Sequence, residues 1–404
     1  MWTHLETKKE KPMNQEIFNQ FVLKTYTRQN VFFKKGKGVW LFDDQKNKWL
    51  DFLSGLGVVN FGHTHPDLVK ALKNQASKLW HTSNHFYIEK QGLAAKKISS
   101  LSFDGKTFFC NSGTEANEAA LKLIKKWGNQ NQKKTIIALK HSFHGRTIGA
   151  LTLTGQEVYQ NDFKPLIPDV VYCEPDNRKD FESKINDQTA GVFIEVIQGE
   201  GGVYPLSKDF VQTVRMLTQK HKALLFIDEI QTGMGRTGKP FAYQHYGIEP
   251  DGITLAKALG NGIPVGAMHV KDEFAVLTPG DHASTFGGNF LAMAVADKAL
   301  TFLKDSKWME NVLKNSRYLE GELNRVVLDY PIITSLRGKG MMWGLVTDRA
   351  SDIFTGLAGE KVIVSNIKNK VIRILPPLVV KKKEIDYFID KLRKVLDQIK
   401  KQGK

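Results

Sequence analysis

Short apolar segments alternate with amphipathic segments through the middle of the chain, and this alternation limits the fold more than any other feature. Four apolar segments are predicted to be buried strands, at residues 135–139, 170–173, 191–197 and 224–227. Helical patterns lie between them, for example at residues 115–127 and 208–220. Strands that alternate with helices form βαβ units, so we predict an α/β fold with a mainly parallel sheet flanked by helices.

The pattern of apolar and charged residues changes near residue 301, where long charged helical segments begin. We therefore predict a large α/β domain at residues 58–300 and a smaller α+β domain at residues 301–404. Residues 13–57 are expected to pack with the smaller domain. Residues 1–12 are polar and are expected to form a disordered extension.

Composition and charge narrow the classes of protein that fit. The chain has 58 Lys and Arg against 42 Asp and Glu, a formal net charge of +16. The densest lysine run, at residues 381–383, opens an amphipathic helical pattern, so a solvated helix face explains it better than a nucleic-acid site. No apolar run approaches the roughly 18 residues that span a bilayer. Two cysteines provide no disulfide framework. We expect a cytoplasmic protein with no membrane or nucleic-acid partner and no metal.

Residues 111–117 (NSGTEAN) combine a helix start with a glycine. Ser112 and Glu115 have the spacing of a capping box, and an apolar-periodic helix follows. Gly113 allows backbone N–H groups at the helix start to approach an anion such as phosphate. An ordinary helix cap explains the same residues and is more common, so this segment alone does not identify a site.

Residues 226–231 (FIDEIQ) place Asp228 at the carboxyl end of an apolar strand. Ligands bind beyond the carboxyl ends of strands in open α/β sheets. A carboxylate there needs a cationic partner, and the pyridinium nitrogen of pyridoxal phosphate (PLP) is one. A loop aspartate that caps the next turn is the competing explanation.

Residues 254–260 (TLAKALG) surround Lys257 with small and apolar residues. Burial lowers the pKa of a lysine and leaves a neutral amine, the form that attacks an aldehyde. In a chain this rich in lysine, a lysine beside alanine and leucine also arises by chance.

Several single residues add weaker indications. Phe143 could stack on a cofactor ring, and Arg146 could bind a carboxylate with two hydrogen bonds. Glu200 lies in a glycine-rich loop, and residues 284–289 (STFGGN) offer hydroxyl and backbone donors for phosphate. Arg373 stands among apolar residues, where it needs an acidic partner. Ordinary turns and exposed arginines account for each of these when taken singly.

The joint order of the motifs is far more specific than any one of them. From about Tyr26 to Val380 the chain resembles the class III (ornithine-type) aminotransferases of PLP fold type I. The resemblance also includes residues 51–55 (DFLSG) and 62–66 (GHTHP) near the N-terminus. The motifs that carry it are NSGTEANEAA, HGRT, IQGEGGV, DEIQTG, TLAKALGNG, STFGGN and RILPPL.

The resemblance implies a role for each residue around the cofactor ring. Lys257 forms the internal aldimine with PLP, and Asp228 pairs with the pyridine nitrogen. Gln231 lies near the ring hydroxyl. Phe143 stacks on one face of the ring, and Ile230 lies on the other.

The resemblance also implies how phosphate and substrate are held. Phosphate is bound by Gly113 and Thr114, helped by Thr285 from the partner subunit of a homodimer. The substrate-binding residues are expected to be Arg146 for the donor α-carboxylate, Ser284, and a switchable pair of Glu200 and Arg373. In this scheme Glu200 masks Arg373 until 2-oxoglutarate enters.

The implied reaction moves the terminal amine of a donor to 2-oxoglutarate, as in arginine biosynthesis. We expect N-acetylornithine as the donor, because Leu56 offers no partner to the charged α-amine of free ornithine. Ornithine, succinylornithine and 4-aminobutyrate stay open as donors. Ala283 and Phe290 stand where the family pattern leads us to expect Gly and Pro, and residues 361–370 lack the glycines common there.

Three other functions remain as alternatives to an aminotransferase. An aminomutase or decarboxylase on the same fold would share the cofactor residues, and its independence of an amino acceptor would distinguish it. A nicotinamide dehydrogenase needs a GxGxxG turn after a strand, and the glycines from Gly260 to Gly266 do not have that spacing. A basic nucleic-acid-binding protein predicts salt-sensitive binding to DNA and no cofactor absorbance.

Overall fold

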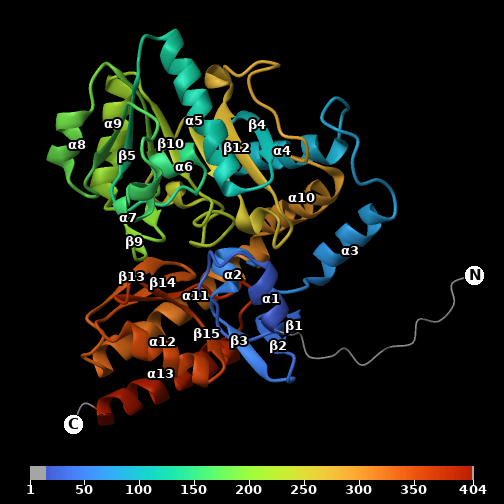
Figure 1. Cartoon of the computed structure of the whole chain (residues 1–404), viewed down its shortest axis with the longest axis vertical. Helices are drawn as coiled ribbons and strands as arrows, with labels where there is room; N and C mark the ends of the chain where they lie inside the picture. Colours follow the sequence, from blue (N-terminus) through green and yellow to red (C-terminus); the bar gives the residue numbers. More distant parts are fainter. Residues whose placement is uncertain (1–14, 403–404) are drawn as a thin grey trace, which may run out of the picture.

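A seven-stranded sheet forms the centre of the larger part of the molecule (Figure 1). The structure is a computed structural model that describes residues 15–402, so the extension predicted at residues 1–12 lies outside the described residues. In spatial order the strands are β4 (Gly105–Cys110), β12 (Gly266–Lys271), β11 (Gly252–Leu255), β10 (Leu224–Asp228), β7 (Thr189–Ile194), β5 (Thr135–Leu139) and β6 (Val170–Cys173).

The prediction of a mainly parallel sheet is confirmed. Strands β11, β10, β7, β5 and β6 pair in parallel, and only β12 is antiparallel to both of its neighbours. One predicted strand was too long. The segment 191–197 leaves the sheet after Ile194, because the Glu195 side chain accepts hydrogen bonds from loop N–H groups and Ile197–Gln198 (β8) pairs instead with Tyr204–Pro205 (β9).

Helices cover both faces of this sheet because alternate strand residues point to opposite sides. Phe193 and Phe226 pack with α5 on one face, whereas Val192 and Leu225 belong to the core shared with α4, α9 and α10 on the other. The helices of this part are α3 (Pro66–Ala76), α4 (Glu89–Leu101), α5 (Gly113–Gln130), α6 (Ile148–Leu153), α7 (Glu157–Gln160), α8 (Arg178–Lys184), α9 (Lys208–Lys220) and α10 (Phe290–Lys304).

The smaller part combines the C-terminal segment with the N-terminal strands (Figure 1). The parallel pairing of β3 with β15 joins the two segments. Its strands are β1 (Phe33–Lys37), β2 (Trp40–Asp43), β3 (Lys48–Asp51), β13 (Ser335–Lys339), β14 (Met342–Val346), β15 (Val362–Ile363), β16 (Ser365–Ile367) and β17 (Val371–Ile374). Its helices are α1 (Gln15–Phe21), α2 (Ser54–Gly57), α11 (Ser306–Asp329), α12 (Ala350–Gly359) and α13 (Lys382–Gln402). The domain limits at residues 58 and 301 stay a prediction.

A buried arginine connects the two parts. Arg236 is fully buried and donates to the carbonyl oxygens of Met341 (3.0 Å) and Pro376 (2.5 Å) in the C-terminal segment. It also donates to Ser54 Oγ (3.2 Å) and to Asn60 Oδ1 in the N-terminal segment. Burial lowers its pKa to about 9. Its hydrogen bonds hold the N-terminal turn at α2 against the segment that follows β17.

None of the helices within residues 15–402 is long and apolar enough to cross a membrane.

Candidate active site

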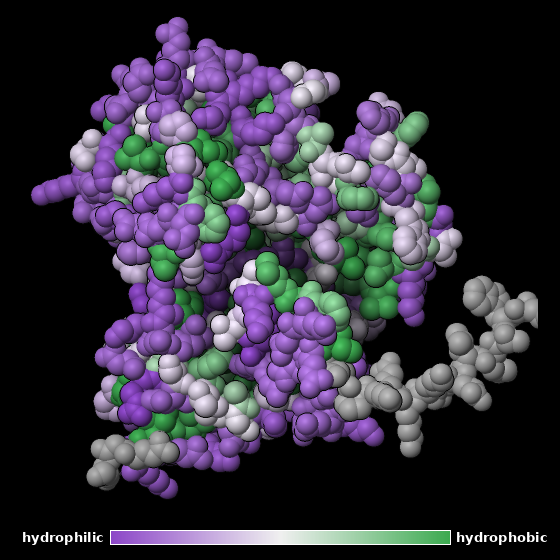
Figure 2. Space-filling view, viewed as in Figure 1, coloured by the Kyte–Doolittle hydropathy of each residue, from purple (hydrophilic) through white to green (hydrophobic). Residues whose placement is uncertain are grey.

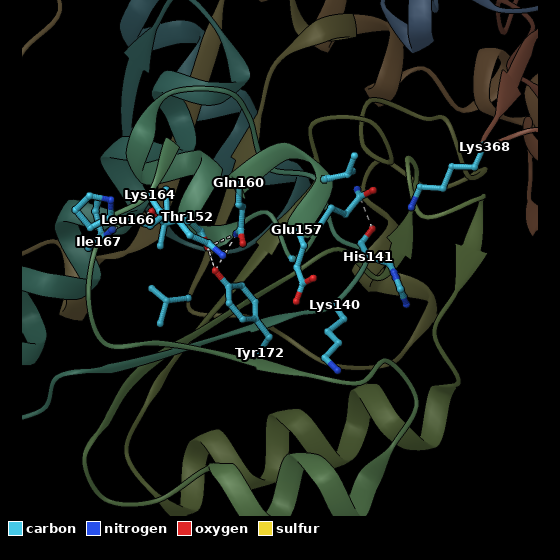
Figure 3. A pocket seen from close by; sticks show the side chains of 15 residues that line it. Lys140, His141, Thr152, Glu157, Gln160, Lys164, Leu166, Ile167, Tyr172 and Lys368 are labelled. Atoms are coloured by element: carbon cyan, nitrogen blue, oxygen red, sulfur yellow. Dashed lines mark hydrogen bonds between the residues drawn. The ribbon is translucent and has the colours of Figure 1, made fainter. Parts of the chain in front are cut away.

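Two cavities lie near the carboxyl ends of the central strands. The larger, about 800 Å³, is lined by residues after β5, the loop around α7, strand β6 and Lys368 (Figure 3). It contains none of the predicted site residues. The smaller cavity, about 280 Å³, is lined by Gly113, Thr114, Phe143, His144, Gly145, Arg146, Glu195, Glu200, Asp228, Ile230, Gln231 and Lys257. This face of the molecule is hollowed where its two parts meet (Figure 2).

Nine of the twelve predicted site residues line the smaller cavity. Arg373 stands behind it and bonds to Glu200 and Gln231, which do line it. Ser284 and Thr285 do not reach it within this chain, and Ser284 Oγ instead accepts hydrogen bonds from Asn111 and Gly287. The chain therefore brings together nine predicted residues between positions 113 and 257 from five separate segments, while their chemical roles stay predictions.

Asp228 ends β10 with a buried carboxylate whose orientation is fixed by three donors. Oδ2 accepts hydrogen bonds from His144 Nδ1 (2.7 Å) and Asn117 Nδ2 (2.9 Å), and Oδ1 accepts from the Ile230 N–H (2.9 Å). An ionised carboxylate can only accept a hydrogen bond, so the proton of this bond is on Nδ1 of His144. A negative charge held this firmly at the floor of a cavity suits a cationic ring nitrogen.

Lys257 follows β11 and has a left-handed backbone conformation, with φ of 45°. A left-handed non-glycine residue is uncommon and occurs often at functional sites. Burial, reinforced by the positive charge of Arg373, lowers the pKa of Lys257 to about 8. Its Nζ has no hydrogen-bond partner in the described part of the chain. A substantial fraction of this amine is therefore neutral near physiological pH.

The first turn of α5 supplies the anion-binding side of the cavity. Ser112 Oγ accepts a hydrogen bond from the Glu115 N–H (3.3 Å), as expected for a capping box. The return bond differs, because the Glu115 carboxylate accepts from the N–H of Asn111 (2.9 Å) and not from that of Ser112. The N–H groups of Gly113 and Thr114 have no acceptor among the described residues. They are thus available to an anion at the positive end of an 18-residue helix.

Two glycines permit the close packing around this turn. A Cβ on Gly113 would lie 2.8 Å from Ile230 Cδ1, and a Cβ on Gly145, whose φ is 138°, would lie 2.2 Å from Thr114 Oγ1. Thr114 Oγ1 is in turn 2.9 Å from Thr147 Oγ1. A larger residue at Gly113 would push the helix start away from Ile230, and one at Gly145 would push it away from the loop that carries Arg146.

Glu200 and Arg373 form an ion pair at the opposite side of the cavity. Arg373 Nη1 donates to Glu200 Oε1 (2.5 Å) and Gln231 Oε1 (3.3 Å), and Nε donates to Ser365 Oγ (3.0 Å). Burial alone would raise the pKa of Glu200, but the Arg373 guanidinium holds it below its usual value. Arg373 is buried and Glu200 is partly exposed, so Glu200 is the member that can move to solvent.

Arg146 contrasts with Arg373, because no ion pair or hydrogen bond holds its guanidinium among residues 15–402. Its side chain is exposed and lies over the ring of Tyr159. Leu56 is 44 % exposed and does not line the cavity. It belongs to α2, a turn in which Ser54, Gly55, Leu56 and Gly57 all have positive φ.

Sequence reasoning missed three residues that complete the site. His144 and Asn117 orient Asp228, and Glu195 lines the cavity while accepting from the N–H groups of Phe143 (3.0 Å) and Gly199 (3.1 Å). Burial raises the pKa of Glu195 well above its usual value. A carboxylate within the apolar run at 191–197 was the available signal, since such a residue is costly unless paired.

The residues present fit PLP. The start of α5 offers unpaired N–H groups to a phosphate, Phe143 and Ile230 offer apolar surface to a ring, and Asp228 offers a charge to a ring nitrogen. Lys257 presents an amine without a hydrogen-bond partner in the described chain. A mixed sheet with this arrangement at its carboxyl edge defines an enzyme of PLP fold type I.

Comparison with known proteins agrees with this class. The chain belongs to the class III aminotransferase family, whose members are PLP-dependent transaminases, and residues 22–396 match that family. It is 41 % identical to the acetylornithine aminotransferase of Caldanaerobacter subterraneus subsp. tengcongensis, over 94 % of this chain and 98 % of the relative.

Solved structures show the same architecture. The N-acetylornithine aminotransferase of Stenotrophomonas maltophilia is 33 % identical, with a TM-score of 0.82 over 95 % of this chain and 98 % of that one. An ornithine aminotransferase of Toxoplasma gondii, described with partial occupancy of PLP at its active site, is 30 % identical. Its TM-score is 0.91, over 96 % of this chain and 94 % of that one.

Proposed function

We propose that this enzyme transfers the terminal amine of N-acetylornithine to 2-oxoglutarate, giving N-acetylglutamate 5-semialdehyde and glutamate. The observation that carries the proposal is the contrast between two arginines. Arg146 has no anionic partner in the described chain, whereas Arg373 is neutralised by Glu200. A donor with one carboxylate needs one free cation, and a dicarboxylate acceptor needs a second. The curated relatives named acetylornithine aminotransferase support the same donor.

Leu56 favours an acylated donor over free ornithine. The α-nitrogen of N-acetylornithine is a neutral amide, whereas that of ornithine is an ammonium that needs an acceptor. Leu56 supplies none. It stands in the turn at Ser54–Gly57, next to Gly57, where a Cβ would lie 3.6 Å from Gln231 Cγ. The same reasoning admits N-succinylornithine as a second donor.

The residues around the ring position each have a task in the proposed mechanism. PLP, when bound, supplies an electron sink for the bond that is broken at the amine-bearing carbon. Lys257 Nζ holds the cofactor and then carries the proton from that carbon. Asp228 keeps the proton on the ring nitrogen, and His144 and Asn117 hold Asp228 in place for this task. Phe143 and Ile230 keep water from the ring faces.

Glu200 and Arg373 would then separate the two halves of the reaction. While a monocarboxylate donor is bound, Glu200 covers Arg373 and the site has one available cation. When 2-oxoglutarate enters, Glu200 turns to solvent and Arg373 binds a carboxylate of the acceptor. Gln231, which also accepts from Arg373, keeps the guanidinium near its position.

We further propose that the active enzyme is a homodimer in which Thr285 completes the partner's phosphate site. Thr285 is exposed and adjoins an apolar surface made by Leu79, Trp80, Phe86, Tyr87 and Phe286. His81 contacts the Phe286 ring at 5.4 Å, so the two segments form one surface. Figure 2 shows hydrophobic surface beside α3, which precedes this region. Large apolar patches of this kind are typical of subunit interfaces.

Steady-state kinetics test the donor. We expect kcat/KM to be highest for N-acetylornithine among N-acetylornithine, N-succinylornithine, ornithine and 4-aminobutyrate, with 2-oxoglutarate as acceptor. Turnover in the absence of any acceptor would indicate an aminomutase or decarboxylase instead. Ornithine or 4-aminobutyrate in first place would overturn the proposed donor.

Subunit mixing tests the shared site. Thr285→Ala chains are expected to bind PLP weakly, and Lys257→Ala chains to be inactive. In a mixed dimer one site combines Lys257 from one chain with Thr285 from the other, so activity should rise on mixing. Unchanged activity after confirmed exchange of subunits would count against the shared site.

A further inference from the structure

Tyr159 contacts both the residue predicted to cover the cofactor ring and the residue proposed to bind the donor. Its ring centroid lies 3.9 Å from Cζ of Arg146 and 6.1 Å from the ring of Phe143, with an angle of 85° between the two rings. We propose that Tyr159 is a positioning residue that holds the Arg146 guanidinium where the α-carboxylate of the donor binds. This inference rests on the proposed function, which assigns donor binding to Arg146.

The guanidinium of Arg146 has little else to hold it. Its side chain is exposed, and within the described residues it makes no hydrogen bond or ion pair. The ring of Phe143 is more distant, at 5.5 Å. A cation over an aromatic face is attracted by the π-electrons without using its N–H donors. Tyr159 therefore restrains Arg146 and leaves all of its donors available for a carboxylate.

Tyr159 also keeps the two arginines of the site in separate roles. Burial would raise the pKa of Glu200, and the positive charges of Arg373, Lys257 and, last, Arg146 lower it. Arg146 and Glu200 line the same cavity, so a guanidinium free to turn inward could pair with this carboxylate. If Arg146 turned to Glu200, the free cation for the donor would be lost and Arg373 would be uncovered at the wrong stage. The stacking contact with Tyr159 favours the other position.

The one-turn helix α7 fixes Tyr159 through two buried glutamines. Four residues are too few to form a stable helix unaided. Gln156, just before α7, donates to Ser142 O (3.0 Å), and Gln160 donates to Thr154 O (2.7 Å) and to the Tyr172 hydroxyl (2.9 Å). Figure 3 shows Gln160 and Tyr172 meeting in the wall of the larger cavity. The helix is anchored before and after Tyr159, so its ring has a defined position.

Two substitutions separate the aromatic face from the other properties of Tyr159. Tyr159→Leu removes the face but keeps an apolar side chain, and Tyr159→Phe loses only the hydroxyl, which has no partner in the described chain. We expect Tyr159→Leu to raise KM for N-acetylornithine and to change kcat little. The expected rise in KM is about three- to thirtyfold, the factor that corresponds to the loss of one cation–π contact. Tyr159→Phe should restore the original KM. Tyr159→Met provides a second test if the leucine variant does not fold.

A donor without the carboxylate shows whether Arg146 mediates the effect. N-acetylputrescine is N-acetylornithine without its α-carboxylate, so its slow reaction should be the same in all Tyr159 variants. In an Arg146→Ala background, Tyr159→Leu should cause no further rise in KM, because the group that Tyr159 positions is absent.

The outcomes distinguish this inference from the proposed function. If Arg146→Ala leaves kcat/KM for N-acetylornithine unchanged, the proposed role of Arg146 is wrong. If Arg146→Ala lowers kcat/KM but Tyr159→Leu does not raise KM, the role of Tyr159 is wrong. The same conclusion follows if Tyr159→Leu raises KM equally in the original enzyme and in the Arg146→Ala background. An unchanged absorbance spectrum of the bound cofactor in Tyr159→Leu would show that the stacking of Phe143 is preserved.

Discussion

The two sides of the candidate active site are built in different ways. On the ring side, Asp228 is buried and takes hydrogen bonds from three groups, and Lys257 is enclosed beside it. On the donor side, Arg146 is exposed and depends on one aromatic contact, and Leu56 is nearly half exposed. Groups that perform the proposed chemistry are fixed by many contacts within one chain, whereas groups that select the donor are held by few.

The largest expected effect is on the ring side. Lys257→Ala should abolish transamination, because no other amine lines the described cavity. It should also abolish the covalent cofactor linkage that borohydride traps, measured by mass spectrometry of the reduced protein. Lys271→Ala serves as the matched control, since Lys271 lies on the neighbouring strand β12 and pairs with Glu249 outside the cavity. Covalent PLP in the Lys257→Ala variant would show that another lysine holds the cofactor.

Asp228→Asn should have the second largest effect. The amide has no negative charge to keep a proton on the ring nitrogen, and its NH₂ group would face the donors that now point at Oδ2. We expect kcat to fall on the order of 10³-fold, the scale of losing one well-placed electrostatic contact. Single-turnover kinetics with N-acetylornithine measure this directly. Turnover within a few-fold of the original enzyme would separate Asp228 from the chemistry.

The same contrast explains what could be predicted from the sequence. Asp228 was predicted because it ends an apolar strand, where ligands bind in open α/β sheets, and Lys257 because small and apolar residues surround it. His144 was not assigned a role, because its contact with Asp228 joins loops 84 residues apart. Arg236 reads as a loop residue in GMGRTG, and nothing local indicates that it is buried between the two parts. Local pattern predicts a carboxylate at a strand end and a lysine in an apolar segment, but not contacts between loops.

Two other residues, one at the phosphate and one on the donor side, were harder to predict for physical reasons. Thr285 has no role within one chain, because the proposed site that it completes belongs to a second copy. The role of Leu56 was predicted only from its lack of a hydrogen-bonding group. Its exposure depends on the left-handed turn at Ser54–Gly57, a conformation that non-glycine residues rarely adopt. Arg236 stabilises that turn by donating a hydrogen bond to Ser54 Oγ.

The pH dependence of cofactor uptake gives an intermediate effect on the ring side. Burial and the charge of Arg373 lower the pKa of Lys257 to about 8 in the cofactor-free enzyme. The amine is neutral above its pKa, so the neutral fraction should rise about tenfold between pH 7 and pH 9. The rate of covalent PLP uptake by the cofactor-free enzyme, followed by absorbance, should rise in parallel. Arg373→Met removes a positive charge and should move the profile to higher pH. A flat profile would contradict a neutral Lys257 as the attacking group.

The smallest expected effect lies on the donor side, at Leu56. Leu56→Tyr places a hydroxyl where the α-nitrogen of the donor is proposed to lie, and Leu56→Phe adds the ring without the hydroxyl. The side chain is 44 % exposed, so both variants should fold. A hydrogen bond to a charged amine contributes about 1.5–3 kcal/mol where water is excluded, and less at a half-exposed position. We therefore expect Leu56→Tyr to shift the ratio of kcat/KM for ornithine over N-acetylornithine by roughly three- to tenfold toward ornithine. Equal shifts of this ratio in Leu56→Phe and Leu56→Tyr would mean that Leu56 acts by packing alone. Selectivity for the acyl group would then arise from other residues around the cavity.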